Sequence, residues 1–257
     1  MSPAFDRLKQ RIERLLGVRI YRFSLPHGVD LLTDLKRKFT SLNFSVVFDV
    51  GANVGQTASV FSTQFPAATI YSFEPVPAVF EALKKNTKDL VNVRVFNLAF
   101  GSNRSQLPMA INVDSRKSSF ALERHRDSSE ISACEVIEVM PLDAFVKEHD
   151  IAKIDFLKVD TEGFDLEVII GAEQMISSEK VDFIQVEVGF LPSTVQVGVE
   201  QFLQHLQQRN YALFGIYEQQ PLWTGEPWLM YANAVFVRRD LWPVHSFDKV
   251  ALPDTVT

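Results

Sequence analysis

The amino-acid sequence predicts an α/β fold built around a mostly parallel sheet. From residue 44 onward, short apolar runs alternate with stretches of helical periodicity, which is the pattern of βαβ units. A glycine-rich turn follows the first apolar run, where a strand would pass into a helix. The chain has 257 residues, of which 46% are hydrophobic and 23% charged. This composition fits a single globular domain and excludes a disordered or fibrous protein.

An N-terminal helical extension, residues 1–43, precedes the main domain, residues 44–257, in this prediction. Residues 3–16 place apolar side chains at helical spacing, and residues 30–40 have the pattern of a second, shorter helix. Residues 1–40 hold nine Lys or Arg and four Asp or Glu. We interpret them as a solvated helix face; the alternative is contact with an anionic surface. Because charged residues interrupt any apolar run within the first helix, we expect no signal peptide.

Seven strands are predicted in the main domain, each a short run rich in apolar residues. In order they are Val46–Val50, Thr69–Phe73, Val93–Leu98, Ile154–Val159, Val181–Val188, Tyr211–Tyr217 and Ala232–Arg238. The helices expected between them are Gln56–Gln64, Pro77–Lys85, Asp165–Gly171 and Val199–Gln208. The last of these helices gathers its apolar residues on one face. A long loop containing Pro221, Gly225 and Pro227 separates the last two strands.

An insertion over about residues 101–150 lies between the third and fourth strands. Leu107–Val113 and Glu135–Val139 alternate apolar and polar residues, so we expect them to pair as a hairpin at the edge of the sheet. Asp114–Ser132 is polar and charged and is typical of a mobile loop. We expect this loop to act as a lid over a bound substrate; the alternative is an exposed loop without a role.

The strongest motif is the turn from Asp49 to Thr57, which carries Gly51, Asn53, Gly55 and Gln56. Glycines let a backbone approach a ligand closely, and the open N–H groups of a following helix favour electron-rich ligand atoms. The dinucleotide fingerprint and the phosphate loop are both absent. The carboxylate of Asp49 would repel pyrophosphate but suits an ammonium group. S-adenosylmethionine has such a group and no phosphate, so we expect it as the cofactor.

A second motif, Phe73-Glu74-Pro75, ends the second strand 25 residues after Asp49. A carboxylate at the carboxyl end of this strand can accept hydrogen bonds from both hydroxyls of a ribose. The alternative is a helix N-terminal charge near Pro77. Because the glycine-rich turn lies one βα unit upstream, we favour ribose binding by Glu74.

A third motif places Asp160 and Glu162 at the end of the fourth strand, and Glu187 lies near the end of the fifth. A capping cluster at a helix start is the alternative for the first two. Three carboxylates brought together repel one another, so one should have a raised pKa unless a cation lies among them. They could supply a general base, hold Mg²⁺, or bind the methionine ammonium and a substrate hydroxyl.

We expect no bound metal, because only Glu187 comes from outside the segment Asp160–Glu162 and no histidine completes a site. For a catalytic or cofactor role we rank Asp160 first and Glu162 second, with Glu187 well behind. His125, in the polar loop, is a further catalytic candidate if it enters the cleft. Three tryptophans near the last two strands suit stacking on sugars, although core packing or a dimer surface is the more ordinary interpretation: Trp223, Trp228 and Trp242.

The sequence resembles the FkbM family of S-adenosylmethionine-dependent methyltransferases. The matching motifs are D-V-G-A-N-V-G at Asp49–Gly55, F-E-P at Phe73–Pro75, N-x-A at Asn97–Ala99, P-L-D-A-F at Pro141–Phe145 and K-V-D-T-E-G-F-D at Lys158–Asp165. The resemblance implies a seven-stranded Rossmann-like sheet of order 3-2-1-4-5-7-6 with strand seven antiparallel. It also implies methyl transfer to a hydroxyl of a sugar, glycan or polyketide-type product.

With this resemblance, ten residues are expected to bind the cofactor: Asp49, Gly51, Asn53, Gly55, Gln56, Thr57, Glu74, Asn97, Ala99 and Asp160. The expected partner is a small-molecule or glycan acceptor. The acidic main domain argues against nucleic acid, and the chain has no apolar run long enough for a membrane span. A single cysteine, Cys134, fits a reducing, cytoplasmic compartment. A homo-oligomer remains open.

Three other functions compete with O-methylation. A methyltransferase for a nitrogen or carbon acceptor would carry the same cofactor motifs. A catalytically silent binding subunit would be expected to have a damaged cofactor turn, whereas Asp49, Gly51, Gly55 and Glu74 are all present. An NAD-dependent dehydrogenase would need a glycine spacing that this sequence lacks.

Overall fold

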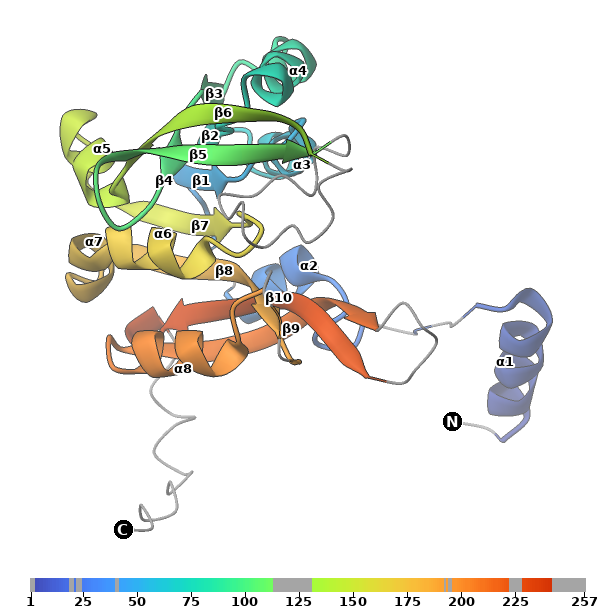
Figure 1. The fold of residues 1–257 in the computed structure, drawn as a ribbon. Coiled ribbons are helices and arrows are strands. Elements are labelled where there is room, and N and C mark those ends of the chain that lie inside the picture. Colours follow the sequence, from blue (N-terminus) through green and yellow to red (C-terminus); the bar gives the residue numbers. More distant parts are fainter. Residues whose placement is uncertain are drawn as a thin grey trace. The chain divides into compact units, whose positions relative to one another are not determined.

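A computed structural model describes residues 3–18, 21, 25–39, 42–112, 131–191, 193, 196–221 and 228–241. The chain divides into two compact units, Met1–Leu42 and Asn43–Thr257 (Figure 1). Residues 114–130 of the expected lid, including His125, and the residues Trp223 and Trp242 lie outside the described residues; the last two lid residues, Ile131 and Ser132, are strand. No helix in the described part of the chain is both long and apolar enough to cross a membrane.

The first unit contains the two predicted helices, α1 (Pro3–Leu16) and α2 (Leu31–Lys38). Asp30 precedes α2, and its side chain accepts a hydrogen bond from the Thr33 N–H at 2.7 Å, which satisfies one of the free donors at the helix start. Within α2, Arg37 pairs with Asp34 at 2.9 Å. Local capping and charge pairing therefore define this helix, as its sequence pattern indicates.

A seven-stranded sheet forms the centre of the second unit, in the order β3-β2-β1-β7-β8-β10-β9. Its strands are β1 (Val46–Val50), β2 (Thr69–Phe73), β3 (Val93–Phe96), β7 (Ile154–Val159), β8 (Val181–Gly189), β9 (Tyr211–Pro221) and β10 (Leu229–Arg238). The first five pair in parallel, and β10 is antiparallel to both β8 and β9. This arrangement confirms the predicted strand order and the single reversed strand.

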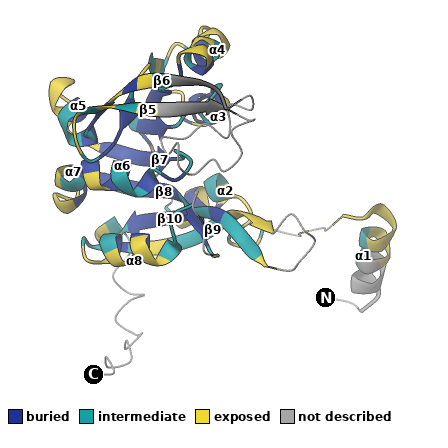
Figure 2. Cartoon of the chain, in the orientation of Figure 1, coloured by how far each residue is buried: buried dark blue, intermediate teal, exposed yellow. Residues whose placement is uncertain are grey.

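Helices connect these strands and cover the sheet (Figure 1). They are α3 (Gln56–Gln64), α4 (Pro77–Thr87), α5 (Leu142–Glu148), α6 (Asp165–Gly171), α7 (Glu173–Ser177) and α8 (Val199–Gln207), with a short 3₁₀ turn at Arg239–Leu241. Helices α5 and α7 were not among the expected helices. Figure 2 shows the helices exposed on their outer sides while the central strands are buried.

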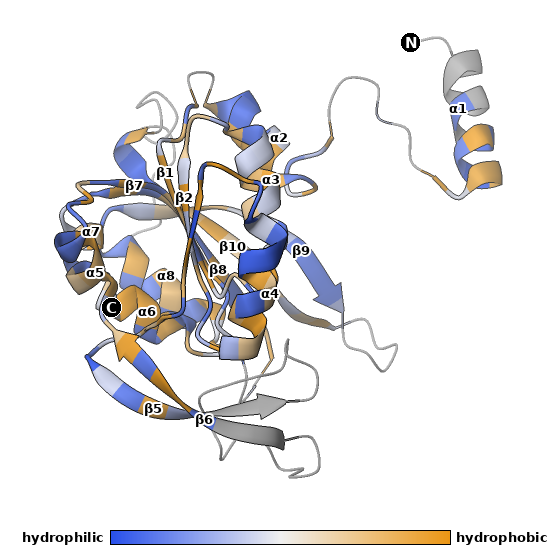
Figure 3. Cartoon of the chain, turned by 90° about the horizontal axis from the view of Figure 1, so that it is seen from above, coloured by the Kyte–Doolittle hydropathy of each residue, from blue (hydrophilic) through white to orange (hydrophobic). Residues whose placement is uncertain are grey.

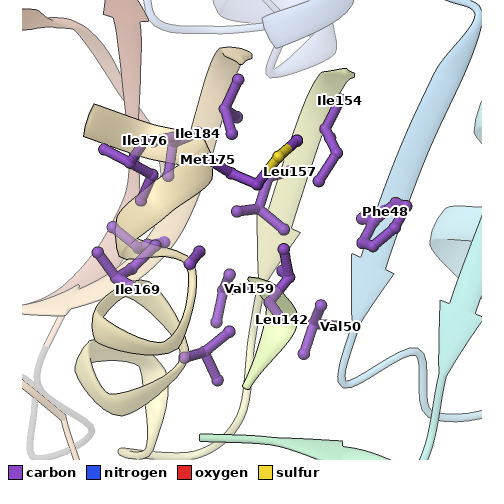
Figure 4. Packing of buried hydrophobic residues seen from close by; sticks show 14 of the residues in the cluster. Phe48, Val50, Leu142, Ile154, Leu157, Val159, Ile169, Met175, Ile176 and Ile184 are labelled. Atoms are coloured by element: carbon purple, nitrogen blue, oxygen red, sulfur yellow. The ribbon is translucent and has the colours of Figure 1, made fainter. Parts of the chain in front are cut away.

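The core lies on both faces of the sheet because successive residues of a buried strand point to opposite sides. On one face, Leu157 and Val159 of β7 pack with Ile169 of α6 and Ile176 of α7 (Figure 4). Each such side chain contributes about 1.5–3 kcal/mol when it is fully buried. On the other face, Phe156 packs at 5.0 Å between ring centroids from Phe61 of α3. Both faces therefore hold the strands in a fixed register beneath the cleft.

The predicted hairpin is present, but its predicted place was wrong. Strands β5 (Ser105–Asn112) and β6 (Ile131–Met140) pair antiparallel, and β6 also pairs with the short strand β4 (Ala99–Phe100). These three form a separate sheet instead of extending the edge of the main one. The chain leaves the main sheet because β3 ends at Phe96, two residues earlier than predicted.

The last two strands are longer than predicted, and the loop between them is correspondingly shorter. Strand β9 continues to Pro221 and β10 begins at Leu229. The end of β9 is hydrophilic (Figure 3), so the sequence showed no apolar run there. Pairing with β10 keeps this polar segment extended, and it brings Glu218 and Asn233 to the site described below.

Candidate active site

A cleft of about 380 Å³ opens at the carboxyl ends of the parallel strands, where ligands bind in sheets of this kind. Its lining comes from the ends of β1, β2, β7 and β8, from the start of β4, and from β9 and β10. The polar and charged lining residues are Asn53, Gln56, Thr57, Glu74, Lys158, Asp160, Thr161, Glu162, Glu187, Glu218 and Asn233.

The glycine-rich turn after β1 is tight because three of its residues adopt left-handed backbone angles. The φ angles are 77° at Gly51, 49° at Asn53 and 95° at Gly55. A Cβ atom on Gly51 would lie 1.9 Å from the Asp160 carbonyl oxygen. Gly51 is therefore required because two turns of the cleft floor meet at this point.

Gly55 contacts helix α4. It does not line the cleft, and a Cβ atom there would meet the side chains of Leu83 and Thr87 on α4, each at 3.0 Å. The glycine therefore makes room for helix α4, and its role toward a ligand stays a prediction.

The backbone of this turn is bound to the neighbouring strand. The N–H groups of Gly51 and Ala52 donate to the Phe73 carbonyl at 3.0 and 2.9 Å, and the Asn53 N–H donates to Glu74 Oε2 at 3.0 Å. These donors are satisfied within the chain. The cleft is therefore lined by side chains of the turn and by Gln56 and Thr57 at the start of α3.

Glu74 lines the cleft with only 7% of its surface exposed. Its Oε1 accepts from the Val76 N–H at 2.9 Å, and its Oε2 accepts from Asn53. Burial raises the pKa of Glu74 to about 7, although both N–H groups oppose the rise. Each carboxylate oxygen has a second lone pair, so the side chain is fixed and can still accept from two ligand hydroxyls.

Asn97 and Asp49 lie outside the cleft lining. The Asn97 Nδ2 atom donates to the carbonyls of Glu74 and Pro75, both at 2.9 Å, so it braces the turn that holds Glu74. Asp49 is fully buried and lies 3.6 Å from Lys158 Nζ. The partner of Asp49 in this structure is thus a lysine of the same protein, and its role toward a ligand ammonium stays a prediction.

Lys158 connects this buried carboxylate to the cleft. It lies beside Asp49 across the β1–β7 pair, and its Nζ atom is 3.0 Å from Asp160 Oδ2. Burial disfavours the charge on Lys158, but Asp160 and Asp49 outweigh that effect and raise its pKa. Lys158 is thus a permanent cation in the cleft floor, and Asp160 is its ion-pair partner.

Glu187 lies at the end of β8, next to β7 in the sheet, and lines the same cleft. Burial and the carboxylates of Asp160, Glu162 and Asp165 raise its pKa to about 8; a hydrogen bond from Gln196 Nε2 at 3.5 Å opposes the rise. The sequence-based expectation that one carboxylate of the group has a raised pKa is confirmed at Glu187, which had been ranked last.

The turn after β7 carries Asp160 and Glu162 into the cleft. Glu162 and Gly163 both have positive φ angles, 52° and 92°. The buried Asp165 stabilises this conformation, because its carboxylate accepts from Thr161 Oγ1 at 3.1 Å and from the Gly163 N–H at 3.2 Å. Burial and the Asp160 charge raise the pKa of Asp165 to about 6. Asp165 thus stabilises the turn without lining the cleft.

Most of the residues selected from sequence meet at the cleft. These are Gly51, Asn53, Gln56, Thr57, Glu74, Ala99, Asp160 and Glu162. Sequence reasoning gave no role to Lys158, Glu218 or Asn233. The alternation along β7 could have predicted that Lys158 lies beside Asp160. The positions of Glu218 and Asn233 in the cleft depend on the long pairing of β9 with β10. Within the described ranges, no group of three or more histidine, cysteine or carboxylate side chains is arranged to hold a metal ion.

The charge of the cleft determines which ligands it suits. Five carboxylates line the described part of it, together with one lysine that Asp160 and Asp49 already pair. Such a lining repels phosphates and favours a ligand with positive charge. S-adenosylmethionine, with a sulfonium, an ammonium and a ribose for Glu74, fits this donor set.

The strand order defines a Rossmann-like fold, and the cleft lies where such folds bind their ligands. The family model described as the methyltransferase FkbM domain matches residues 49–213. The chain therefore belongs to the FkbM methyltransferase family, and S-adenosylmethionine is its cofactor.

Three curated relatives show the same kinship. The hexuronic acid methyltransferase AglP of Haloferax volcanii is 30% identical over 151 residues, 58% of this chain and 59% of that protein. The 2-O-methyltransferase NoeI of Sinorhizobium fredii is 24% identical over 153 residues, 55% and 62% of the two chains. The 31-O-demethyl-FK506 methyltransferase FkbM of Streptomyces tacrolimicus is 38% identical over 65 residues, 25% and 21%. The chain thus spans about three fifths of the length of the first two.

Proposed function

We propose that the protein is an O-methyltransferase that methylates a hydroxyl of a sugar, glycan or polyketide-type molecule. The observation that carries this proposal is the group of carboxylates, Asp160, Glu162 and Glu187, in the same cleft as Glu74. A hydroxyl must lose its proton when it is methylated, and a carboxylate beside it can take that proton. The names of the relatives AglP, NoeI and FkbM refer to a hexuronic acid, a 2-O position and a 31-O position.

The cleft has two ends in this proposal. Glu74 follows β2, whereas Glu187 lies at the end of β8, three positions along the sheet. With strands about 4.8 Å apart, these positions are separated by about 14 Å. We assign the ribose to the Glu74 end and the acceptor to the end formed by Glu187, Glu218 and Asn233.

When it is bound, S-adenosylmethionine supplies a methyl group on a positively charged sulfur, which needs no further activation. The chain's own residues orient the reactants and keep charges in place. Glu74, fixed by two N–H groups, holds the ribose hydroxyls. Asp160, held by Lys158, places a negative charge in the middle of the cleft.

The test is a screen of acceptors with S-adenosylmethionine labelled in its methyl group. The full chain is incubated with methyl glucuronide, neutral methyl hexosides, chitin oligosaccharides and hydroxylated macrolides, alongside amine acceptors as the alternative. Products are analysed by mass spectrometry, and the methylated atom is identified by NMR. We expect the label on an oxygen. Transfer to nitrogen or carbon alone would refute the proposal.

A further inference from the structure

The carboxylates that line the acceptor end of the cleft have different surroundings, and this difference assigns their roles. Asp160 is held by a cation: its Oδ2 atom lies 3.0 Å from Lys158 Nζ. This contact occupies one oxygen of Asp160 and fixes the side chain toward the lysine. We therefore assign Asp160 to positioning and not to direct contact with the acceptor proton.

A different observation excludes Glu74 as the base that removes the proton from the acceptor hydroxyl. Both of its oxygens accept backbone N–H groups, from Val76 and Asn53, and its strand lies three positions from β8 in the sheet. A base must be within hydrogen-bond reach of the proton that it removes. Glu74 is therefore placed for the ribose and away from the acceptor.

Glu187 combines a place in the cleft lining with a largely buried, acidic setting. It accepts a long hydrogen bond from Gln196 Nε2 at 3.5 Å, in the segment that follows β8. Asn233 lies opposite it on β10, and Asn233 Nδ2 donates to Glu218 Oε2. The acceptor end thus presents Glu187 with hydrogen-bonding side chains on the neighbouring strands.

We propose that Glu187 is the general base that removes the proton from the acceptor hydroxyl. This proposal rests on the proposed O-methyltransferase function. The acceptor oxygen forms its new bond to the methyl carbon, and its proton passes to the Glu187 carboxylate. The electron pair of the carbon–sulfur bond stays with sulfur, which becomes neutral. The proton on Glu187 then leaves to water.

The charged groups around Glu187 support this assignment. Asp160 and Glu162 of the β7–α6 turn and Asp165 at the start of α6 are close enough to raise its pKa. Tyr231 of β10 is close enough for its own pKa to be raised by burial and by Glu187, Glu162 and Asp160, and Glu218 and Lys158 line the same cleft. Burial, followed by the charges of Asp160, Glu162 and Asp165, raises the pKa of Glu187 to about 8. A bound cation would lower it toward neutral pH, the range in which a general base works best.

The first test does not depend on the acceptor. The chain is labelled with ¹³C at the glutamate side-chain carboxyls and titrated by NMR with S-adenosylhomocysteine present, in wild type and in Glu187→Gln. We expect one carboxyl that titrates between about pH 7 and 8 and is absent from the variant. A Glu187 signal that titrates near its ordinary value of 4.5 would overturn the proposal.

The second test separates a base from a merely structural residue. Wild type, Glu187→Gln and the exposed control Glu81→Gln are compared on the hydroxyl acceptor found in the screen and on its thiol analogue. A thiol ionises near pH 8.5 by itself and needs little help from a base. We expect Glu187→Gln to lower kcat by about 10²–10⁴-fold for the hydroxyl and less than tenfold for the thiol, with unchanged S-adenosylhomocysteine affinity.

Equal losses on both acceptors, or no loss on the hydroxyl, would overturn the role of Glu187. Glu81 is two-thirds exposed on α4, so Glu81→Gln should behave as wild type. If wild type methylates no hydroxyl at all, the proposed function fails, and the NMR titration still decides whether Glu187 holds a proton near neutral pH. The two failures are therefore distinguishable.

Discussion

Lys158 Nζ lies 3.0 Å from Asp160 Oδ2 and 3.6 Å from Asp49 Oδ1. One ammonium group therefore joins a fully buried carboxylate to one in the cleft that is 37% exposed. The contact explains why strand β7 places a lysine among apolar residues. It also explains how two carboxylates can lie close together near the glycine-rich turn: the positive charge of Lys158 offsets the charges of Asp49 and Asp160.

Replacing Lys158 with methionine should leave Asp49 buried without its cation. Breaking a buried pair in this way costs about 3–5 kcal/mol; because Asp160 is partly exposed, we expect the free energy of unfolding to fall by about 3 kcal/mol. Urea denaturation at pH 7 measures the change. Lys84→Met, in an exposed pair with Glu81, is the control and should change stability by less than about 0.5 kcal/mol.

The double variant Lys158→Met/Asp49→Leu should recover part of the lost stability, since removal of both buried charges is often tolerated. If Lys158→Met were as stable as wild type, the pairing inferred from these distances would not contribute to stability.

Two glycines of one turn should respond differently to alanine. Gly51→Ala places a Cβ atom 1.9 Å from the Asp160 carbonyl, so two turns of the cleft must move. We expect at least a tenfold loss of S-adenosylhomocysteine affinity by calorimetry, together with lower stability. Gly55→Ala meets only side-chain ends of α4 at 3.0 Å. It should lose about 1–2 kcal/mol of stability through its positive φ angle and keep its affinity within about threefold.

Equal affinity losses in Gly51→Ala and Gly55→Ala would contradict the distinction between a floor contact and a helix contact. Stability is measured on the same samples, so that a variant which fails to fold is recognised before its affinity is interpreted.

The fold was predictable where burial alone decides the structure. Strands such as Val46–Val50 and Thr69–Phe73 have the predicted bounds, because a parallel strand buried on both faces is apolar throughout. The polar end of β9 was missed, since only its pairing with β10 keeps Glu218 extended. The residue types at the end of β9 do not indicate that this segment pairs with β10.

The site was predictable to the level of motifs and less so for individual side chains. The sequence places Asp49 at a strand end but does not say which neighbour it faces, and the register Asp49–Lys158 follows only from the sheet order. Glu187 was ranked last because its position in the chain reveals neither its burial nor the three carboxylates around it. Both sets of contacts join residues far apart in sequence.

The pH dependence of stability should contain a contribution from Glu187. Its folded-state pKa of about 8 exceeds the ordinary value of 4.5, so between these values the folded state retains a proton that the unfolded state releases. The free energy of unfolding therefore falls as pH rises from about 4.5 to 8, and the contribution levels off above that range.

Glu187→Gln removes this contribution and should be more stable than wild type at pH 8.5. We expect on the order of 2 kcal/mol, less than the full pKa shift implies because the side chain is partly exposed. Denaturation at pH 5 and pH 8.5 in both proteins measures it, and Glu74 and Asp165 contribute alike to each. A constant difference between the two proteins at both pH values would contradict the shift.

Ligand affinity should depend on pH through Glu74, with the opposite sign. Burial raises the pKa of Glu74 to about 7, so the free protein holds a proton there at pH 6 and has largely lost it at pH 8. An ionised carboxylate accepts hydrogen bonds from ribose hydroxyls more strongly than a protonated one. The affinity for S-adenosylhomocysteine should therefore rise about tenfold from pH 6 to pH 8 and change little above that, as measured by calorimetry.

The variant Glu74→Gln should bind S-adenosylhomocysteine about 10–100-fold more weakly than wild type. Its affinity should not rise with pH, because the amide does not titrate and its NH₂ group would face the N–H of Asn53 or Val76. Glu81→Gln should follow the wild-type curve. A wild-type affinity that stays constant between pH 6 and pH 8 would show that Glu74 does not bind the ligand through its ionised form.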